Sequence, residues 1–198
     1  MKTHLLYIIL TLAILLFSCS KETNYLSDWD EDVAVFGEQL AKRHKDLFFN
    51  ISEADFNRSI EELRAKVATL SDAEIVVELT KIVSKIGDAH TKVKFKNRLN
   101  ALPFQLAWLD DGIILTKADV AHYAALGSEV VGINGTEMST VLDSFRTVIP
   151  FENEANFKRQ AMIYLRNLEF YSYFNIGDAA TDLVLNLADG RAITIGQE

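Results

Sequence analysis

The chain has 198 residues, and its 20 basic and 28 acidic side chains give a formal net charge of −8 at pH 7. This acidic balance, with no Lys/Arg cluster of the kind that follows phosphates, argues against a nucleic-acid partner. Hydrophobic residues make up 49% of the chain, enough to build a core, so the composition excludes a disordered or low-complexity protein.

The first residues are typical of an export signal. Lys2 precedes an apolar run over residues 5–17, which is shorter than the roughly 20 residues needed to span a bilayer. The only cysteine, Cys19, follows Leu-Phe-Ser, a sequence that resembles the lipobox of bacterial lipoproteins, whose cysteine is lipidated. We therefore expect a signal peptide at residues 1–18 and a lipidated tether at residues 19–32. The alternative is an ordinary signal peptide with an incidental cysteine.

A lipidated Cys19 implies a location in the bacterial cell envelope, either periplasmic or exposed at the cell surface. Each methylene of an acyl chain contributes ~0.8 kcal/mol when buried in the membrane, so the lipids of a lipoprotein hold it firmly. The membrane is therefore a predicted partner through the lipid anchor. A single cysteine also excludes an intramolecular disulfide.

Three helices are predicted next, because apolar residues recur at intervals of three to four. The first covers residues 32–48, and the second begins at Ser52. The third begins at Ser71, which is followed three residues later by a glutamate in a capping box, and it ends at Gly87. These segments predict a three-helix bundle over residues 33–91.

After this bundle the hydrophobic period changes to two, which indicates strands. The Asp-Gly and Asn-Gly dipeptides between the apolar runs are strong signals for hairpin turns. The fold class is therefore α+β, with a β-rich module and inserted helices over residues 92–198. Its predicted elements are strands at 93–95, 104–109, 113–116 and 129–133, helices at 139–148 and 153–174, and a terminal hairpin at 183–195.

The segment of greatest chemical interest follows the third helix and reads Gly-Asp-Ala-His-Thr. Here Asp88 and His90 stand two residues apart on a tight turn. An imidazole held rigidly there can act as a general base, and a nearby carboxylate can orient it. The alternative is structural: Asp88 caps the turn, and His90 is a satisfied polar residue where the two parts of the chain meet.

Other motifs of catalysis are missing from the sequence. It has no phosphate loop, dinucleotide glycine fingerprint, paired zinc histidines or Gly-x-Ser-x-Gly elbow. Beyond the leader, the histidines His44, His90 and His122 are widely spaced. We therefore expect no metal site and no cofactor. The aromatic residues between 164 and 174 have helical spacing, which is more typical of core than of a ligand platform.

Three helices, this turn and the later segment GSEVVGINGT at residues 127–136 together resemble the N-terminal half of the tail-specific, or C-terminal-processing, serine proteases, especially their tricorn-like lipoprotein branch. The resemblance covers residues 30–195. It implies that His90 is the catalytic base, supported by Asp88, and that the later segment belongs to a PDZ-like module that handles peptide. The peptide-binding residues that it implies are Gly132, Ile133, Asn134 and Gly135.

The chain departs from this family at its C-terminal end. The family's nucleophilic serine lies in a C-terminal domain, after a Gly-Gly loop, and neither feature occurs before Glu198. We therefore expect the N-terminal region of a serine peptidase for peptides or unfolded protein chains, inactive until a missing catalytic domain or subunit supplies the nucleophile. The alternative is a non-enzymatic, membrane-tethered module that binds peptides or envelope partners.

Overall fold

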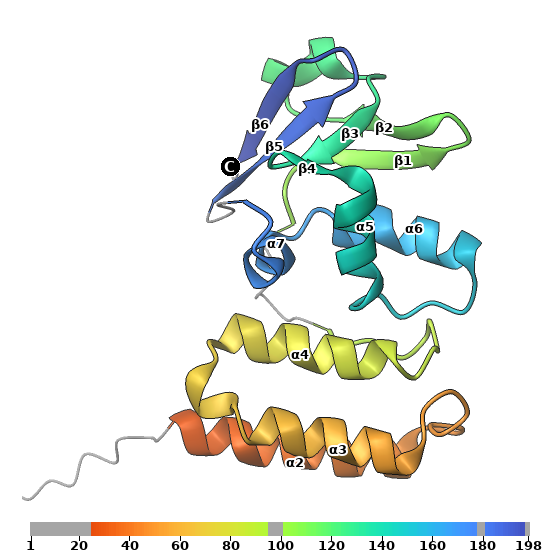
Figure 1. The fold of residues 1–198 in the computed structure, drawn as a ribbon, viewed down its shortest axis with the longest axis vertical. Coiled ribbons are helices and arrows are strands. Elements are labelled where there is room, and N and C mark those ends of the chain that lie inside the picture. The colour runs from red at the N-terminus through yellow and green to blue at the C-terminus, as the bar shows by residue number, and fades with distance from the viewer. Residues whose placement is uncertain (1–24, 95–100, 178–180, 197–198) are drawn as a thin grey trace, which may run out of the picture.

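The computed structural model describes residues 25–94, 101–177 and 181–196, and it confirms the α+β fold class. A layer of helices forms one half of the molecule, and a sheet with its own helices forms the other (Figure 1). The first half contains α2 (Tyr25–Arg43), α3 (Glu53–Arg64), the short 3₁₀ helix η1 (Val67–Thr69) and α4 (Asp72–Ser84). Cys19 and the leader lie outside the described residues.

The second and third helices begin where the sequence signals placed them. The first helix, α2, begins at Tyr25, before its expected start at residue 32 and within residues 19–32, which were expected to be a tether. The Ser52 side chain accepts a hydrogen bond from the backbone N–H of Asp55 at the start of α3. At the start of α4, Ser71 Oγ accepts from the Glu74 N–H at 3.3 Å, and Glu74 Oε2 accepts from the Ser71 N–H at 2.7 Å. Both pairs satisfy N–H groups that have no partner within the helix, so the predicted capping box is confirmed.

The first helix ends earlier than its apolar pattern predicts. It stops at Arg43 instead of residue 48. The His44 ring turns back and its Nδ1 accepts the Asp46 N–H at 3.2 Å, which stabilises a turn where the helix was expected to continue. Leu47 still packs into the bundle core from this turn. A residue can therefore keep its place in the apolar pattern without being helical.

The described residues of the second half form ten short elements. They are β1 (Gln105–Leu109), β2 (Gly112–Lys117), η2 (Val120–Ala125), β3 (Val130–Ile133), β4 (Thr136–Glu137), α5 (Met138–Arg146), α6 (Glu154–Tyr164), α7 (Leu168–Phe174), β5 (Asp182–Leu187) and β6 (Ala192–Gly196). Strands β1 and β2 form an antiparallel hairpin, and the other four form a sheet in the order β4-β3-β5-β6. A bridge between Ile114 and Glu129 connects the hairpin to this sheet.

The Asn134-Gly135 turn between β3 and β4 is confirmed. Both residues have positive φ, 52° and 75°, as the tight hairpin turn requires. The Asn134 side chain does more than favour the turn, because it donates to the Ile176 carbonyl at 3.0 Å and accepts the Val184 N–H at 2.8 Å. This one side chain therefore connects the β3–β4 turn to the segment that enters β5.

Two predicted elements differ from the structure. The expected helix over residues 153–174 is two helices, α6 and α7, because the backbone at Arg166 and Asn167 pairs with the segment at Ala101 and Leu102. The expected strand at residues 93–95 is not formed in its described part, which ends at Lys94.

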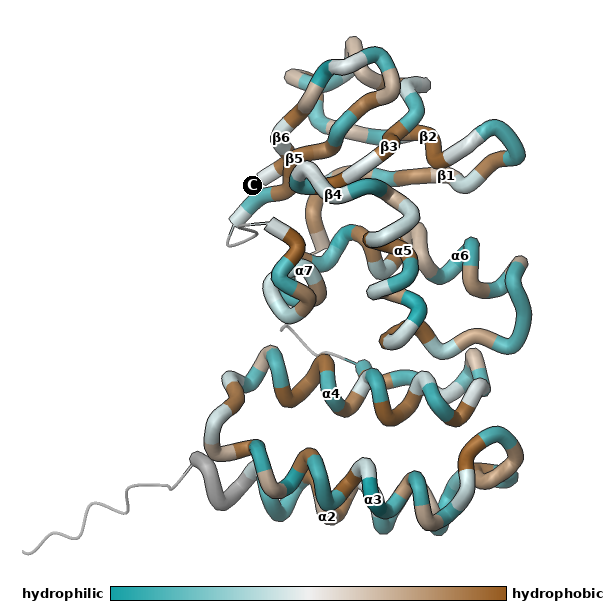
Figure 2. The backbone as a smooth tube through the Cα atoms, viewed as in Figure 1, coloured by the Kyte–Doolittle hydropathy of each residue, from teal (hydrophilic) through white to brown (hydrophobic). Residues whose placement is uncertain are grey.

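The buried hydrophobic residues form two clusters, and α4 contributes to both. Figure 2 shows α4, with hydrophobic residues along its length, between the other bundle helices and the second half. Ile75, Leu79 and Ile82 belong to the bundle core, whereas Val77 belongs to the core of the second half. Phe145 lies within the second core, with ring centroids 5.0 Å from Tyr171 and 5.6 Å from Phe170. These aromatic residues are core, as their helical spacing predicts. The shared helix holds the turn at its end, residues 87–91, against the second half.

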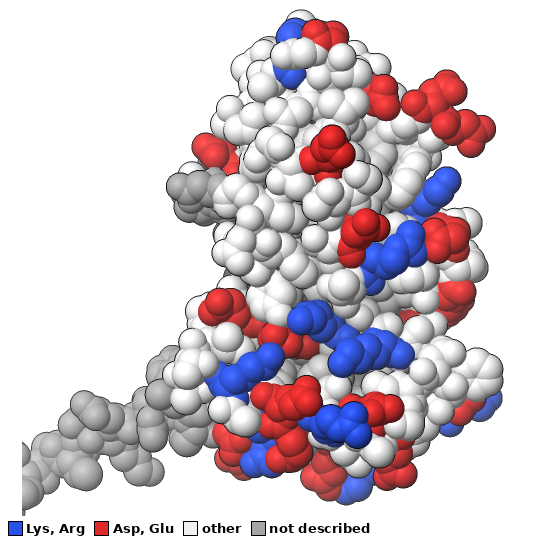
Figure 3. All heavy atoms as spheres, viewed as in Figure 1, with Lys and Arg blue, Asp and Glu red and all other residues white. Residues whose placement is uncertain are grey.

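The surface and the helices show two further features. On the face in Figure 3, acidic and basic side chains are interspersed over the bundle, while the sheet half carries fewer charges. Within the described ranges, no helix is long and apolar enough to cross a membrane.

Candidate functional site

The turn that carries Asp88 and His90 is fixed by its glycine. Gly87 follows α4 with φ of +70°, a backbone conformation that favours glycine. A Cβ at this position would lie 2.6 Å from Asn50 Nδ2, which itself donates to the Ile86 carbonyl at 2.9 Å. The chain therefore leaves the helix in one direction and brings the next four residues to the boundary between the two halves.

Asp88 is the centre of the site. Its Oδ1 accepts the His90 backbone N–H at 2.8 Å and lies 3.2 Å from His90 Nδ1. Its Oδ2 accepts the Thr91 hydroxyl at 2.6 Å and lies 3.1 Å from His44 Nε2. These donors, the Thr91 hydroxyl first among them, hold the pKa of Asp88 well below its ordinary value of 3.8. Asp88 is therefore a carboxylate throughout the neutral range.

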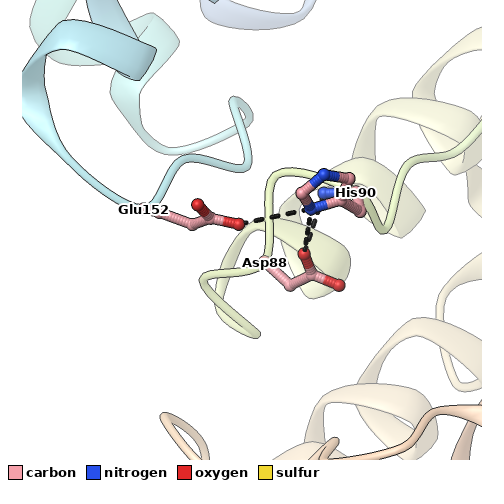
Figure 4. Close-up of side chains that lie close together, drawn as sticks. All are labelled: Asp88, His90 and Glu152. Carbon is pink, nitrogen blue, oxygen red and sulfur yellow. Dashed lines mark hydrogen bonds and ion pairs between the residues drawn. The ribbon is translucent and has the colours of Figure 1, made fainter.

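His90 presents its ring to solvent, with 89% of the side chain exposed. Its Nδ1 faces Asp88 Oδ1 and, at 3.4 Å, Glu152 Oε1 from the loop between α5 and α6 (Figure 4). None of the described residues forms a hydrogen bond with its Nε2. Two carboxylates beside Nδ1 favour the tautomer of the neutral ring that carries its proton on that nitrogen, and in this tautomer the Nε2 lone pair is free to accept a proton. This is the arrangement that a general base requires.

Sequence reasoning missed two members of this site, His44 and Glu152. His44 is 14% exposed, and its Nδ1 accepts the Asp46 N–H, so the ring proton is on Nε2 and is donated toward Asp88. His44 precedes Asp88 by 44 residues, and Glu152 comes from the second half of the chain. No local pattern in the sequence relates either of them to the turn. The third histidine, His122, lies elsewhere, with Nε2 2.9 Å from the Thr194 carbonyl.

A cleft of about 650 Å³ lies beside the turn, lined by residues of both halves. Arg43, Lys45 and Asn50 come from the end of α2 and the loop after it, and Glu152 comes from the second half. The exposed Phe49 also lines it. A substrate segment that reached His90 would therefore meet a mixed polar and aromatic surface.

The four residues that the resemblance implies for peptide binding are placed within the sheet. Gly132 and Ile133 pair with β4 on one edge of β3 and with β5 on the other. Asn134 holds the turn, and the Gly135 N–H donates to Asn186 Oδ1 at 2.9 Å. Both edges of β3 are already paired at Gly132 and Ile133, so neither edge is free for a peptide to add as a strand. The contact of these residues with peptide stays a prediction. Within the described residues, no hydrogen bond joins these four positions to the His90 turn.

Thr91→Ala is expected to raise the pKa of Asp88 toward 3.8, because the hydroxyl is the strongest cause of its lowering. A carboxyl whose pKa is lowered by folding adds stability that is fully present above its unfolded pKa and is lost as the pH falls below it. The variant should thus be less stable than the wild type at pH 7. The difference between their free energies of unfolding should become smaller as the pH is lowered toward 2. Urea unfolding at several pH values measures this.

The matched control is Thr147→Ala, whose hydroxyl donates to the Ser144 backbone carbonyl at 2.7 Å and, among the described residues, forms no hydrogen bond with a titrating group. The difference in free energy of unfolding between Thr147→Ala and the wild type should not depend on pH. If the loss of unfolding free energy in Thr91→Ala were also independent of pH, the role given to the Thr91 hydroxyl would be contradicted.

Comparison with known proteins supports the fold. No family model matches the sequence. No curated protein matches it either. Solved structures that share its fold include two of CPAF, a chlamydial tail-specific protease-like serine protease. A CPAF mutant with a serine replaced by alanine gives a TM-score of 0.60 at 14% identity, and mature CPAF complexed with lactacystin gives 0.59 at 14% identity.

In both comparisons, the match covers 86% of this chain and 34% of CPAF. The chain thus spans about a third of the CPAF chain. At this identity the likeness shows the fold alone, which this chain shares with part of CPAF.

Proposed function

We propose that this chain is the N-terminal region of a tail-specific-protease-like serine peptidase, in which His90 is the general base and Asp88 orients it. The observation that carries the proposal is the geometry of His90, with Nδ1 held 3.2 Å from an ionised carboxylate and Nε2 directed away from it. The likeness in fold to CPAF adds to this argument.

In the proposed reaction, a serine hydroxyl from outside this chain approaches Nε2. His90 takes the hydroxyl proton as the oxygen attacks the scissile carbonyl carbon, and it later gives that proton to the leaving amine. Asp88 stabilises the imidazolium that forms between these steps. His44 and Thr91 hold the second oxygen of Asp88 and keep its first oxygen toward His90. The substrate would be a peptide or an unfolded protein chain.

The proposed location is the bacterial cell envelope, with the chain anchored by lipid on Cys19. The lipobox-like sequence before this cysteine supports the proposal. A peptidase held there would act on chains that reach the membrane surface.

Two measurements test the peptidase proposal. The first is to sequence the locus past the codon for Glu198 and to assay the complete product on an unfolded protein substrate. A frame that continues into a Gly-Gly loop and a serine-bearing turn, with hydrolysis of the substrate, supports the proposal. A stop codon at this point with no hydrolysis overturns it.

The second measurement uses the chain alone. Nitrogen-15 NMR of the imidazole is expected to show that the neutral ring of His90 carries its proton on Nδ1. Asp88→Asn replaces an acceptor with an amide whose N–H can donate to Nδ1, so the proton should move to Nε2. Asp46→Asn, a change of the same kind in the wall of the neighbouring cleft, should leave the proton on Nδ1. Wild-type His90 with its proton on Nε2 would contradict the role given to Asp88.

A second candidate function is peptide binding without catalysis, and one feature favours it. A groove of about 540 Å³ lies between the β1–β2 hairpin, β3 and α5, with Trp108, Val131 and Met138 among its lining residues. It could hold an extended peptide in a module of PDZ type. Such an adaptor would bind peptide equally well with and without the His90 imidazole, which distinguishes it from the peptidase.

A further inference from the structure

One nitrogen of the site faces two carboxylates that come from different halves of the molecule. His90 Nδ1 lies 3.2 Å from Asp88 Oδ1 and 3.4 Å from Glu152 Oε1 (Figure 4). All three atoms lie within 4.8 Å of one another. The turn after α4 supplies Asp88 and His90, and the loop between α5 and α6 supplies Glu152.

Few protein donors reach these two carboxylate oxygens, and both side chains are partly exposed to solvent. A neutral imidazole has a single proton on Nδ1, and two carboxylate oxygens compete for it. Asp88 Oδ1 also accepts the His90 backbone N–H, and Glu152 Oε1 accepts the Ala89 N–H at a long 3.4 Å. Two anionic groups are thus held close together around one proton. A cation at their centre would interact favourably with both.

The spacing fits a small divalent ion. Zinc binds histidine nitrogen and carboxylate oxygen at about 2.0–2.2 Å, and two ligands of a tetrahedral site are then about 3.3–3.5 Å apart. The two measured separations, 3.2 and 3.4 Å, are close to this value. We propose that Asp88 Oδ1, His90 Nδ1 and Glu152 Oε1 bind a divalent transition-metal ion of the zinc class.

The surrounding residues resemble the outer shell of a metal site. Ligating carboxylates are usually held by hydrogen bonds through their other oxygen. Asp88 Oδ2 is held in this way by the Thr91 hydroxyl and by His44 Nε2, which leaves Oδ1 directed at His90.

Metal binding has a direct consequence for catalysis, and this consequence rests on the proposed function. An ion bound to Nδ1 requires a neutral ring with its proton on Nε2. The proton therefore transfers from Nδ1 to Nε2, and no lone pair remains to accept the serine proton. Bound metal would thus inhibit the peptidase, and it would also connect the two halves of the chain.

The test uses the untagged protein, so that no added histidines bind metal. Titration with zinc chloride in a calorimeter should show one ion per chain, and cobalt chloride should give the visible absorption of tetrahedral cobalt. Glu152→Gln should weaken binding of zinc at least about tenfold, since even the loss of an outer-shell partner costs a metal site about 10–100-fold. Glu154→Gln is the matched control, because Glu154 instead pairs with Arg146 at 2.7 Å.

Equal zinc affinity in the wild type and in Glu152→Gln would overturn the inference, as would the lack of tetrahedral cobalt bands. Zinc binding is measured without any assay of hydrolysis. A failure of the metal-site proposal can therefore be distinguished from a failure of the peptidase proposal. In an active complete product, zinc should inhibit the wild type more strongly than Glu152→Gln. Active enzyme that zinc inhibits equally in both would overturn the inference and leave the peptidase assignment intact.

Discussion

Replacing His90 by alanine is expected to lower peptide hydrolysis by the complete gene product by about 10⁴-fold or more. Without the imidazole, no group at this position can take the serine proton, and members of a catalytic unit lose almost all activity when one is removed. The fold should be unaffected, because the His90 side chain is 89% exposed. The measurement is the rate of peptide hydrolysis, with a thermal unfolding curve of the same variant.

His122→Ala provides the matched control for this prediction. It also removes an imidazole near a carboxylate, since His122 Nε2 lies 3.9 Å from Asp119 Oδ2, but it does so away from the turn. Its rate should stay close to that of the wild type. If His90→Ala retained a rate within about tenfold of the wild type while remaining folded, His90 would not be the base.

Phe145→Ala is expected to reduce the free energy of unfolding by about 3–5 kcal/mol, the usual cost of deleting a buried aromatic ring. Phe145 is buried on α5, and its ring contacts Phe170, Tyr171 and Phe174 of α7. Removal would leave a cavity between these helices that their surroundings can fill only in part. Urea unfolding followed by circular dichroism measures the loss.

The control for the second prediction is Phe49→Ala, because that side chain is 77% exposed. It should change stability by less than about 0.5 kcal/mol, as surface substitutions usually do. Similar losses for the two variants would show that the packing around Phe145 contributes little to stability.

Features set by nearby residues were predictable from the sequence. The Ser71 capping box and the Asn134-Gly135 turn depend on contacts within about four positions, and both are present as expected. The glycine after α4 ended that helix for the same reason. Apolar periodicity also identified the three helices of the bundle, because their buried faces are continuous.

Features set by distant residues were not predictable in this way. The break between α6 and α7 depends on pairing with Ala101 and Leu102, which lie more than 60 positions earlier. The site is similar: Asp88 and His90 were found as a local motif, but His44 and Glu152 reach it only through the fold. A single sequence does not indicate which distant residues come together in the fold.

The shared use of α4 has a consequence for how this protein can be divided. One face of the helix supports the bundle through Ile75 and Leu79, and Val77 faces the other core. Ser84 Oγ also donates to the Thr147 carbonyl at 2.6 Å across the boundary. A cut after residue 91 would follow the predicted domain boundary and yet expose an apolar surface on both fragments. We therefore expect the two halves to unfold together, and the contact between His90 and Glu152 to persist only while both are folded.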